Sequence, residues 1–110
     1  MGRGEYLGEL EQIVLLAVAH LEADAYGMSI RREIEQRAGR SVAIGAVYAT
    51  LERLEEKGYV RTIERRRAAD ADARARRFFE LTTGGIDALR AASELHDRMW
   101  AGLRLRRSSR

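Results

Sequence analysis

Several residue types and patterns are absent from this sequence of 110 residues, and each absence excludes a class of protein. The chain has no cysteine, so it has neither disulfide bonds nor thiolate metal sites. It has no run of about 18 apolar residues to span a membrane, and its N-terminus lacks the apolar stretch of a signal peptide. Only two histidines occur, His20 and His96, and they are far apart, so we expect neither a metal nor a cofactor. We therefore expect a cytoplasmic domain with one modest core.

Lysine is nearly absent as well, since the 20 basic residues comprise 19 arginines and Lys57. Genomic base composition explains that ratio better than function does, and the distribution of charge is more informative. Residues 1–57 carry 7 basic and 10 acidic side chains, whereas residues 58–81 carry 7 and 4, and residues 82–110 carry 6 and 3. Clustered positive charge favours an anionic partner, and arginine suits bidentate contacts with phosphate and guanine.

Apolar residues at helical spacing predict two helices in the first 40 residues. The first helix covers residues 8–21, and its polar side carries Glu9, Glu11 and Gln12. The second covers residues 28–38 and ends at Gly39. The apolar face of the first helix comprises Leu10, Ile13, Val14, Ala17, Val18 and Leu21.

A third helix is predicted after Ser41, which either caps it or precedes it. Gly58 suits the left-handed position that ends a helix. Two strands follow, over residues 59–64 and 77–81, because both segments are rich in β-branched and aromatic residues. The intervening run of arginine, alanine and aspartate is typical of a hairpin tip. The buried stripe of the third helix comprises Ile44, Val47, Tyr48, Leu51 and Leu54.

The last predicted helix begins at Thr82 or Thr83, either of which is a suitable cap. Its inner face comprises Ile86, Leu89, Ala92 or Ser93, His96, Trp100 and Leu103. The order of elements predicts a mainly α fold with a small β-hairpin. We expect a winged helix-turn-helix domain over residues 1–81, followed by a C-terminal dimerisation helix and basic tail over residues 82–110.

The third helix has the features of a helix that enters the major groove of DNA. One face is aliphatic, and the opposite face near the N-terminus carries small residues that allow close approach of the backbone. The free N–H groups at that end attract phosphate. A plain amphipathic helix with a small outer face is an equal alternative. The expected DNA-contacting residues of this segment are Arg40, Ser41, Ala43, Gly45, Ala46, Tyr48, Ala49, Thr50 and Arg53.

Tyr48 has two interpretations, because it is aromatic on an otherwise aliphatic face. It packs in the core, or its hydroxyl bonds a phosphate from the edge of the stripe, which we favour. The hairpin arginines contact phosphate or the minor groove, or else form a solvated basic surface. Because side chains alternate along strands, only some can face DNA at once. These arginines are Arg65, Arg66, Arg67, Arg74, Arg76 and Arg77.

Four segments resemble the PadR family of bacterial transcriptional regulators: LGELEQIVLLAV at 7–18, AYGMSIRREIE at 25–35, GAVYATLERLEEKGYV at 45–60 and RRFFELTTGG at 76–85. The resemblance spans residues 7–90. The features in the family's order and spacing are Tyr26-Gly27, Tyr48-x-x-Leu51-x-x-Leu54 and Leu81-Thr82-x-x-Gly85.

The resemblance implies a homodimeric repressor whose third helix contacts double-stranded DNA and whose Tyr48 contacts the DNA backbone. In this family the first and last helices build the dimer, and members often repress genes for phenolic-acid detoxification, multidrug efflux or ABC transporters. This chain departs from the family at the wing tip, which is commonly glycine-rich, because Asp70 and Asp72 place negative charge there. Its C-terminal helix is short, so we expect no large effector domain.

The last helix would expose an apolar stripe on a monomer, and such a surface favours an interface. A two-fold dimer presents two recognition helices to a palindromic site. Some compact relatives hold flat hydrophobic molecules between aromatic residues at the dimer centre, so a small hydrophobic or aromatic effector is one interpretation. Simple filling of the dimer core is the interpretation that we weight more highly. The residues concerned are Leu89, His96, Met99, Trp100 and Leu103.

Two other classes of function are alternatives to DNA binding. An enzyme has little support, because no nucleophile occurs with a base and an orienting third group. A winged helix that binds a partner protein is the main alternative, with Glu52, Glu55 and Glu56 as its contact surface. Salt-dependent affinity for duplex DNA distinguishes the two.

Overall fold

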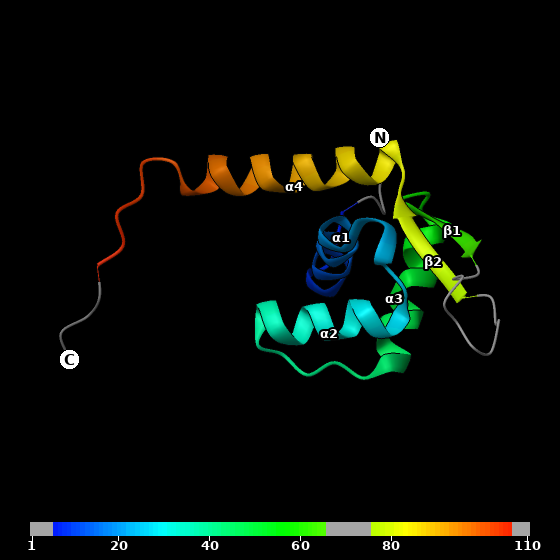
Figure 1. Ribbon diagram of the computed structural model, residues 1–110. Coiled ribbons are helices and arrows are strands. Elements are labelled where there is room, and N and C mark those ends of the chain that lie inside the picture. Colours follow the sequence, from blue (N-terminus) through cyan, green and yellow to red (C-terminus); the bar gives the residue numbers. More distant parts are fainter. Residues whose placement is uncertain (1–5, 66–75, 107–110) are drawn as a thin grey trace.

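The computed structural model describes residues 6–65 and 76–106, and it contains helices packed beside a β-hairpin with one long helix extending away (Figure 1). This architecture confirms the predicted mainly α fold with a small hairpin. No described helix is long and apolar enough to cross a membrane. The elements are α1 (Glu9–Leu21), the 3-10 turn η1 (Glu22–Asp24), α2 (Gly27–Ala38), α3 (Ile44–Glu56), β1 (Val60–Arg65), β2 (Arg76–Leu81) and α4 (Thr83–Trp100).

The core lies where α1, α2 and α3 meet the inner face of the hairpin. Leu15 at the centre of α1 is fully buried, although the predicted stripe omitted it, and Leu10 and Ile13 are only partly buried. Phe78 and Phe79 of β2 are each 2% exposed, so the hairpin closes the core. The other buried apolar residues are Val14, Ala17, Val18, Ala25, Ile30, Ile34, Val42, Val47, Leu51, Leu54 and Val60.

The helix ends follow local backbone chemistry. Gly39 and Gly58 adopt φ values of +68° and +81°, and these left-handed conformations end α2 and turn the chain from α3 into β1. Thr82 caps α4, because its hydroxyl oxygen accepts a 3.0 Å hydrogen bond from the Gly85 N–H. The alternative that Ser41 caps α3 is wrong, since the cap position is Ala43 and no side chain bonds there.

The hairpin is attached to the helical part through β2. β1 and β2 pair antiparallel, with Val60 opposite Leu81 and Arg65 opposite Arg76. Tyr26, immediately before α2, forms a bridge with Phe78, and the Phe79 N–H donates to the Ala25 carbonyl at 2.8 Å. The start of α2 therefore acts as a short third strand that fixes the hairpin to the core.

Helix α4 is buried against the described part of the chain mainly near its beginning. Gly85 is the only buried residue along α4, all of which is described, and Leu89 is partly buried against the core. A Cβ at Gly85 would lie 2.1 Å from the Tyr59 carbonyl oxygen, so a side chain is excluded at this joint. Figure 1 shows α4 passing over α1 and ending clear of it. The prediction that the helical face continues to Leu103 is wrong, because α4 ends at Trp100.

Candidate nucleic-acid interface

Helix α3 separates its apolar face from a face of small residues. Val47, Leu51 and Leu54 are at most 1% exposed, which places the aliphatic side in the core as predicted. Residues 41, 43, 45 and 49 are exposed, and Ala46 is partly buried. Among the described residues, no heavy atom lies within 4 Å of the position that a Cβ of Gly45 would occupy. The first two turns of α3 thus present backbone and methyl groups to solvent, with no bulky side chain except Tyr48.

Thr50 does not belong to that exposed face, and the expectation that it contacts DNA is wrong. Its side chain is fully buried, and its hydroxyl donates a 2.8 Å hydrogen bond to the Ala46 carbonyl. Thr50 lies three residues after Val47 and four before Leu54, so it occupies the middle of the buried stripe. The bond to the preceding turn satisfies the hydroxyl and allows this polar residue to be buried.

Tyr48 lies at the edge of the stripe, 39% exposed, with the hydroxyl end of its ring against the start of α2. A Cβ at Gly27 would lie 2.2 Å from the Tyr48 hydroxyl oxygen and 2.4 Å from its Cζ, so Gly27 provides the space for the ring. This position is intermediate between the two predicted interpretations. The ring covers Gly27, while a third of the side chain stays in contact with solvent.

The segment before α3 is fixed by a contact that the sequence did not reveal. The Arg31 Nε donates a 2.9 Å hydrogen bond to the carbonyl of Val42, whose side chain is 9% exposed. Two cations predicted to contact DNA are paired with carboxylates of α1. Arg40 lies 3.3 Å from Glu9, and Arg53 lies 3.6 Å from Glu11. Their charge is thus partly neutralised within the chain.

Glu11 joins the beginning of α1 to the end of α3 and was expected to be solvated. It accepts hydrogen bonds from the Gly8 N–H at 2.8 Å and from Lys57 Nζ at 3.0 Å to each carboxylate oxygen. Burial alone raises the pKa of Glu11, but the Gly8 N–H together with Lys57 and Arg53 lowers it below its usual value. Lys57 also donates to the Tyr6 carbonyl at 3.4 Å. The carboxylate therefore holds α3 against α1.

Only some of the hairpin arginines are among the residues that the structure describes. Arg66, Arg67 and Arg74 lie outside the described residues, and Arg65 ends β1 with its side chain undescribed. Arg76 places its guanidinium 4.7 Å from the centroid of the Tyr26 ring. Arg77 stacks on Phe79 at 5.4 Å and bonds the Thr62 hydroxyl at 3.5 Å.

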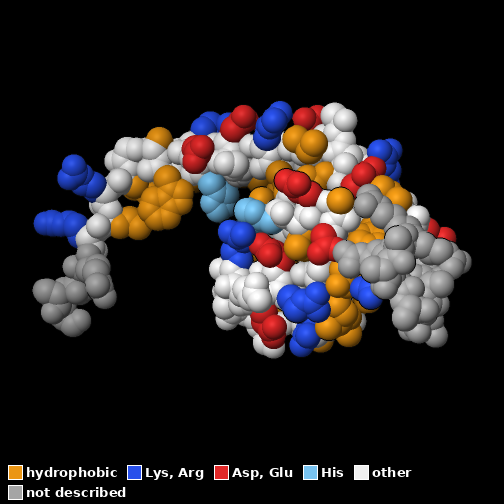
Figure 2. Space-filling view, viewed as in Figure 1, with side chains coloured by type: hydrophobic (Ala, Val, Ile, Leu, Met, Phe, Trp, Pro, Cys, Tyr) orange, Lys and Arg blue, Asp and Glu red, His pale blue; other side chains and the backbone are white. Residues whose placement is uncertain are grey.

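The residues expected at a dimer or effector site lie along α4 from Leu89 to Trp100, with Leu103 just beyond its end. Met99, Trp100 and Leu103 are 70%, 56% and 55% exposed. His96 is exposed, and Leu89 is partly buried nearer the joint. Figure 2 shows a hydrophobic cluster on the part of α4 that extends beyond the domain, followed by basic side chains. A surface of this kind on a single chain is suited to burial against another molecule.

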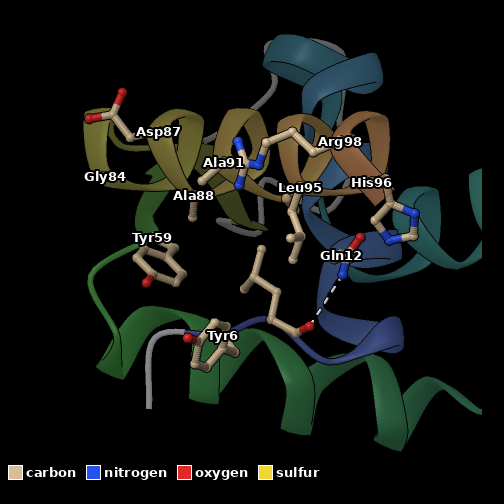
Figure 3. Close-up of a pocket in the computed structure, with 12 residues that line it drawn as sticks. Tyr6, Gln12, Tyr59, Gly84, Asp87, Ala88, Ala91, Leu95, His96 and Arg98 are labelled. Carbon is tan, nitrogen blue, oxygen red and sulfur yellow. Dashed lines mark hydrogen bonds between the residues drawn. The ribbon is translucent and has the colours of Figure 1, made fainter. Parts of the chain in front are cut away.

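A cleft of about 730 Å³ lies between α4 and the segment leading into α1 (Figure 3). Leu95 points into it from α4, opposite Tyr6, and Leu7 also lines it. His96 lies at its edge near Gln12, whose amide donates a 3.2 Å hydrogen bond to the Leu7 carbonyl. Of the five expected dimer or effector residues, only His96 lines this cleft. Leu95 and Tyr6 were not predicted, because Leu95 lies off the stripe and Tyr6 precedes the first helix.

Solved structures with the same fold come from several organisms. RosR of H. salinarum is 26% identical with a TM-score of 0.66, covering 89% of this chain and 81% of that chain. A PadR-like transcription factor from Bacteroides fragilis is 22% identical with a TM-score of 0.68, and the alignment covers 82% of each chain. A PadR family transcription regulator from Clostridium difficile is 21% identical with a TM-score of 0.63, covering 84% of this chain and 88% of that chain. The last two demonstrate a shared fold alone.

A comparison with curated proteins finds no match. The family model of the transcriptional regulator PadR-like family matches residues 15–91, which include α2, α3, the hairpin and the joint with α4. Members of this family are transcription regulators and not enzymes. The chain belongs to the PadR-like family and is a DNA-binding transcriptional regulator.

Proposed function

We propose that this protein is a repressor that binds a palindromic operator as a homodimer, with α3 of each protomer in the major groove. The observation that supports this most directly is the small, exposed outer face at the start of α3, at Ala43, Gly45 and Ala49. An α-helix fits the major groove when its outer side chains do not hold its backbone away from the base edges. In this proposal residues 1–81 bind DNA and residues 82–110 join the protomers.

Groups beside this face supply the backbone contacts of the proposed complex. Ser41 is exposed just before α3, and Tyr48 keeps part of its ring in solvent next to the start of α2. Arg40 would exchange its exposed ion pair with Glu9 for a phosphate at little cost, because such surface pairs contribute about 0–1 kcal/mol. The hairpin arginines add phosphate contacts, which position the protein without specifying sequence.

The apolar face of α4 supports the homodimer. Met99 and Trp100 are mostly exposed at the end of a helix in which Gly85 is the only buried residue. Pairing of two such helices about a two-fold axis buries both faces and places two α3 helices on one side of the dimer.

A small hydrophobic or aromatic effector would bind at the same face, between the two protomers. Trp100 is the only tryptophan in the chain, so its fluorescence reports directly on this site. Titration with planar aromatic compounds tests the effector part of the proposal. Binding of an effector should quench the fluorescence of Trp100 and release bound DNA. A compound that derepresses the target gene but leaves the fluorescence of Trp100 unchanged would contradict an effector site at this face.

The DNA-binding assignment is tested by substituting one exposed alanine of α3. Ala49→Glu places a carboxylate on the outer face, where it would face phosphate and base edges, so fluorescence anisotropy should show loss of duplex binding. Ala38→Glu is the matched control, because Ala38 is also exposed and ends α2 on the side away from the hairpin (Figure 1). Circular dichroism should show both variants folded.

Each outcome of this comparison is informative. Equal binding by both variants would remove α3 from the interface and favour the alternative in which Glu52, Glu55 and Glu56 contact a partner protein. Whether the protein represses or activates is tested by transcription in vitro from the DNA upstream of the protein's own gene. Transcription should fall as the protein is added, whereas a rise would identify an activator.

A further inference from the structure

Three side chains from different parts of the chain gather where α2 begins beside β2. The Arg32 Nη2 donates a 3.1 Å hydrogen bond to the Tyr26 hydroxyl oxygen. The guanidinium of Arg76 lies over the same ring, 4.7 Å from its centroid. One tyrosine thus contacts two cations, one from α2 and one from the base of the hairpin.

Tyr26 is held firmly enough to act as a fixed support. Its backbone N–H donates to the Ser29 hydroxyl at 2.9 Å, and its backbone bridges Phe78. Its ring meets the Phe78 ring edge-on at 5.4 Å, and Phe78 is buried. Because the hydroxyl oxygen accepts from Arg32, the hydroxyl proton is directed elsewhere and can be donated to a ligand.

Arg32 differs from the other arginines of the helical domain in its partner. Arg31, Arg37, Arg40 and Arg53 each lie within 4.0 Å of a glutamate carboxylate. Within the described part of the chain, exposed Arg32 forms no ion pair and bonds a neutral hydroxyl instead. It therefore keeps its full charge while its guanidinium is oriented, and four of its N–H donors can still bind an anion.

The position of this group connects it with the outer face of α3. Gly27, the residue after Tyr26, is covered by the hydroxyl end of Tyr48. A continuous surface therefore runs from Tyr48 of α3, across the start of α2, to Tyr26 and Arg32. Figure 1 shows the start of α2 beside both the hairpin and α3, and Figure 2 shows basic side chains next to a hydrophobic patch over α2.

We propose that Tyr26, Arg32 and Arg76 form a phosphate clamp that binds the backbone of the DNA strand next to the groove entered by α3. This inference rests on the proposed role of α3, since the clamp lies beside it. Its donors are two guanidinium groups and one hydroxyl, which suit phosphate oxygens and contact no base edge. The clamp fixes the depth and orientation of α3 and increases affinity for every DNA sequence equally.

The test is the salt dependence of binding to a duplex of arbitrary sequence, so that no operator is needed. Arg32→Ala should lower the slope of log affinity against log salt by about 0.9, the change expected for one lost phosphate contact. Arg37→Ala is the matched control, because Arg37 is another exposed arginine of α2 but is paired with Glu33 at 2.7 Å. Its slope should equal that of the wild type.

Tyr26→Phe tests the support itself, since it keeps the ring beneath Arg76 and removes only the hydroxyl. Affinity should fall in the wild-type background, and it should fall by less when Arg32 is already alanine, because only the direct hydroxyl contact then remains to be lost. An unchanged slope for Arg32→Ala in a protein that binds DNA would overturn the clamp. If the losses of affinity from Tyr26→Phe and Arg32→Ala are fully additive, Tyr26 does not orient Arg32. If Ala49→Glu leaves DNA binding intact while Arg32→Ala lowers the salt slope, α3 does not enter the groove, but Tyr26, Arg32 and Arg76 still bind phosphate.

Discussion

At the scale of single residues, polar side chains inside the domain define how α3 is held. Glu11 and Thr50 are both buried, and each has its hydrogen bonds satisfied. Neither position was predictable from its residue type. Thr50 is polar within an apolar stripe, and the cation that bonds Glu11 most closely, Lys57, is 46 residues away in sequence. A periodic pattern predicts which face of a helix is buried, but it does not reveal a long-range partner that allows a charge to be buried there.

Neutralising Glu11 should destabilise the protein at neutral pH. Glu11→Gln removes the charge that Lys57 and Arg53 face, and we expect the free energy of unfolding at pH 7 to fall by about 1–2 kcal/mol. The depressed pKa of Glu11 means that its contribution is complete above the unfolded glutamate pKa of about 4.3 and is lost as the pH falls through the folded value. Urea unfolding at pH 7 and pH 3 measures both effects.

A matched control for this prediction is Glu9→Gln. Glu9 is also paired with an arginine, but its side chain is 79% exposed, so the change should stay within about 0.5 kcal/mol. The difference between Glu11→Gln and the wild type should shrink at pH 3, because this pH lies below the unfolded glutamate pKa of about 4.3 and part of the stabilisation by the charged carboxylate has then been lost. A difference that is equal at the two pH values would show that the charge of Glu11 does not stabilise the fold.

Gly27 should influence DNA binding through Tyr48. In Gly27→Ala the new methyl group would overlap the Tyr48 hydroxyl end, so the ring must move while the fold is kept. If Tyr48 bonds a phosphate, affinity for duplex DNA should fall about fivefold, equivalent to one hydrogen bond of about 1 kcal/mol. Anisotropy titrations measure this loss. Tyr48→Ala/Gly27→Ala should bind no more weakly than Tyr48→Ala, and a larger loss would mean that Gly27 acts by another route.

At the scale of elements, local signals in the sequence predicted the bounds of α1, α2, β1 and β2 to within one residue. Gly39, Gly58 and Thr82 all end or begin elements as expected, because left-handed glycine and threonine capping are local properties of the backbone. The third strand-like contact at Tyr26 was missed, since one bridging residue leaves no periodic pattern. The extent of α4 past Trp100 was overestimated, and Gly102 with φ +80° lies just after its end.

The joint between the hairpin and α4 should depend on the absence of a side chain at Gly85. Gly85→Ala would place a methyl group against the Tyr59 carbonyl, which is backbone and cannot move aside cheaply, so the start of α4 must shift. We expect a loss of about 1–3 kcal/mol in the free energy of unfolding, measured with urea. Gly84→Ala is the neighbouring control, because its Cβ would lie 3.4 Å from the nearest atom, the Gly58 carbonyl oxygen. Equal losses in both variants would contradict a specific role for Gly85.

At the scale of the whole molecule, the proposed dimer links the apolar face of α4 to operator binding. Trp100→Ala should shift the protein toward monomer in sedimentation velocity, because it removes a large side chain from the proposed interface. Affinity for a full palindrome should fall toward that for a single half-site, while half-site affinity should stay unchanged. Arg104→Ala, also exposed but beyond α4, is the control. A dimer that persists in Trp100→Ala would place the interface elsewhere.

The attachment of the hairpin to the start of α2 has a consequence for how DNA is released. The Tyr26–Phe78 bridge and the Phe79–Ala25 hydrogen bond join β2 to the start of α2, which packs against α3. In the proposed dimer, two such units joined through α4 can change their separation and relative angle while the contacts among β2, α2 and α3 are kept. An effector bound at α4 would therefore act on the spacing of the two α3 helices, which must match one helical turn of DNA, about 34 Å, or a multiple of it. Induction in the proposed dimer would then change the spacing and angle between two protomers whose own folds stay the same.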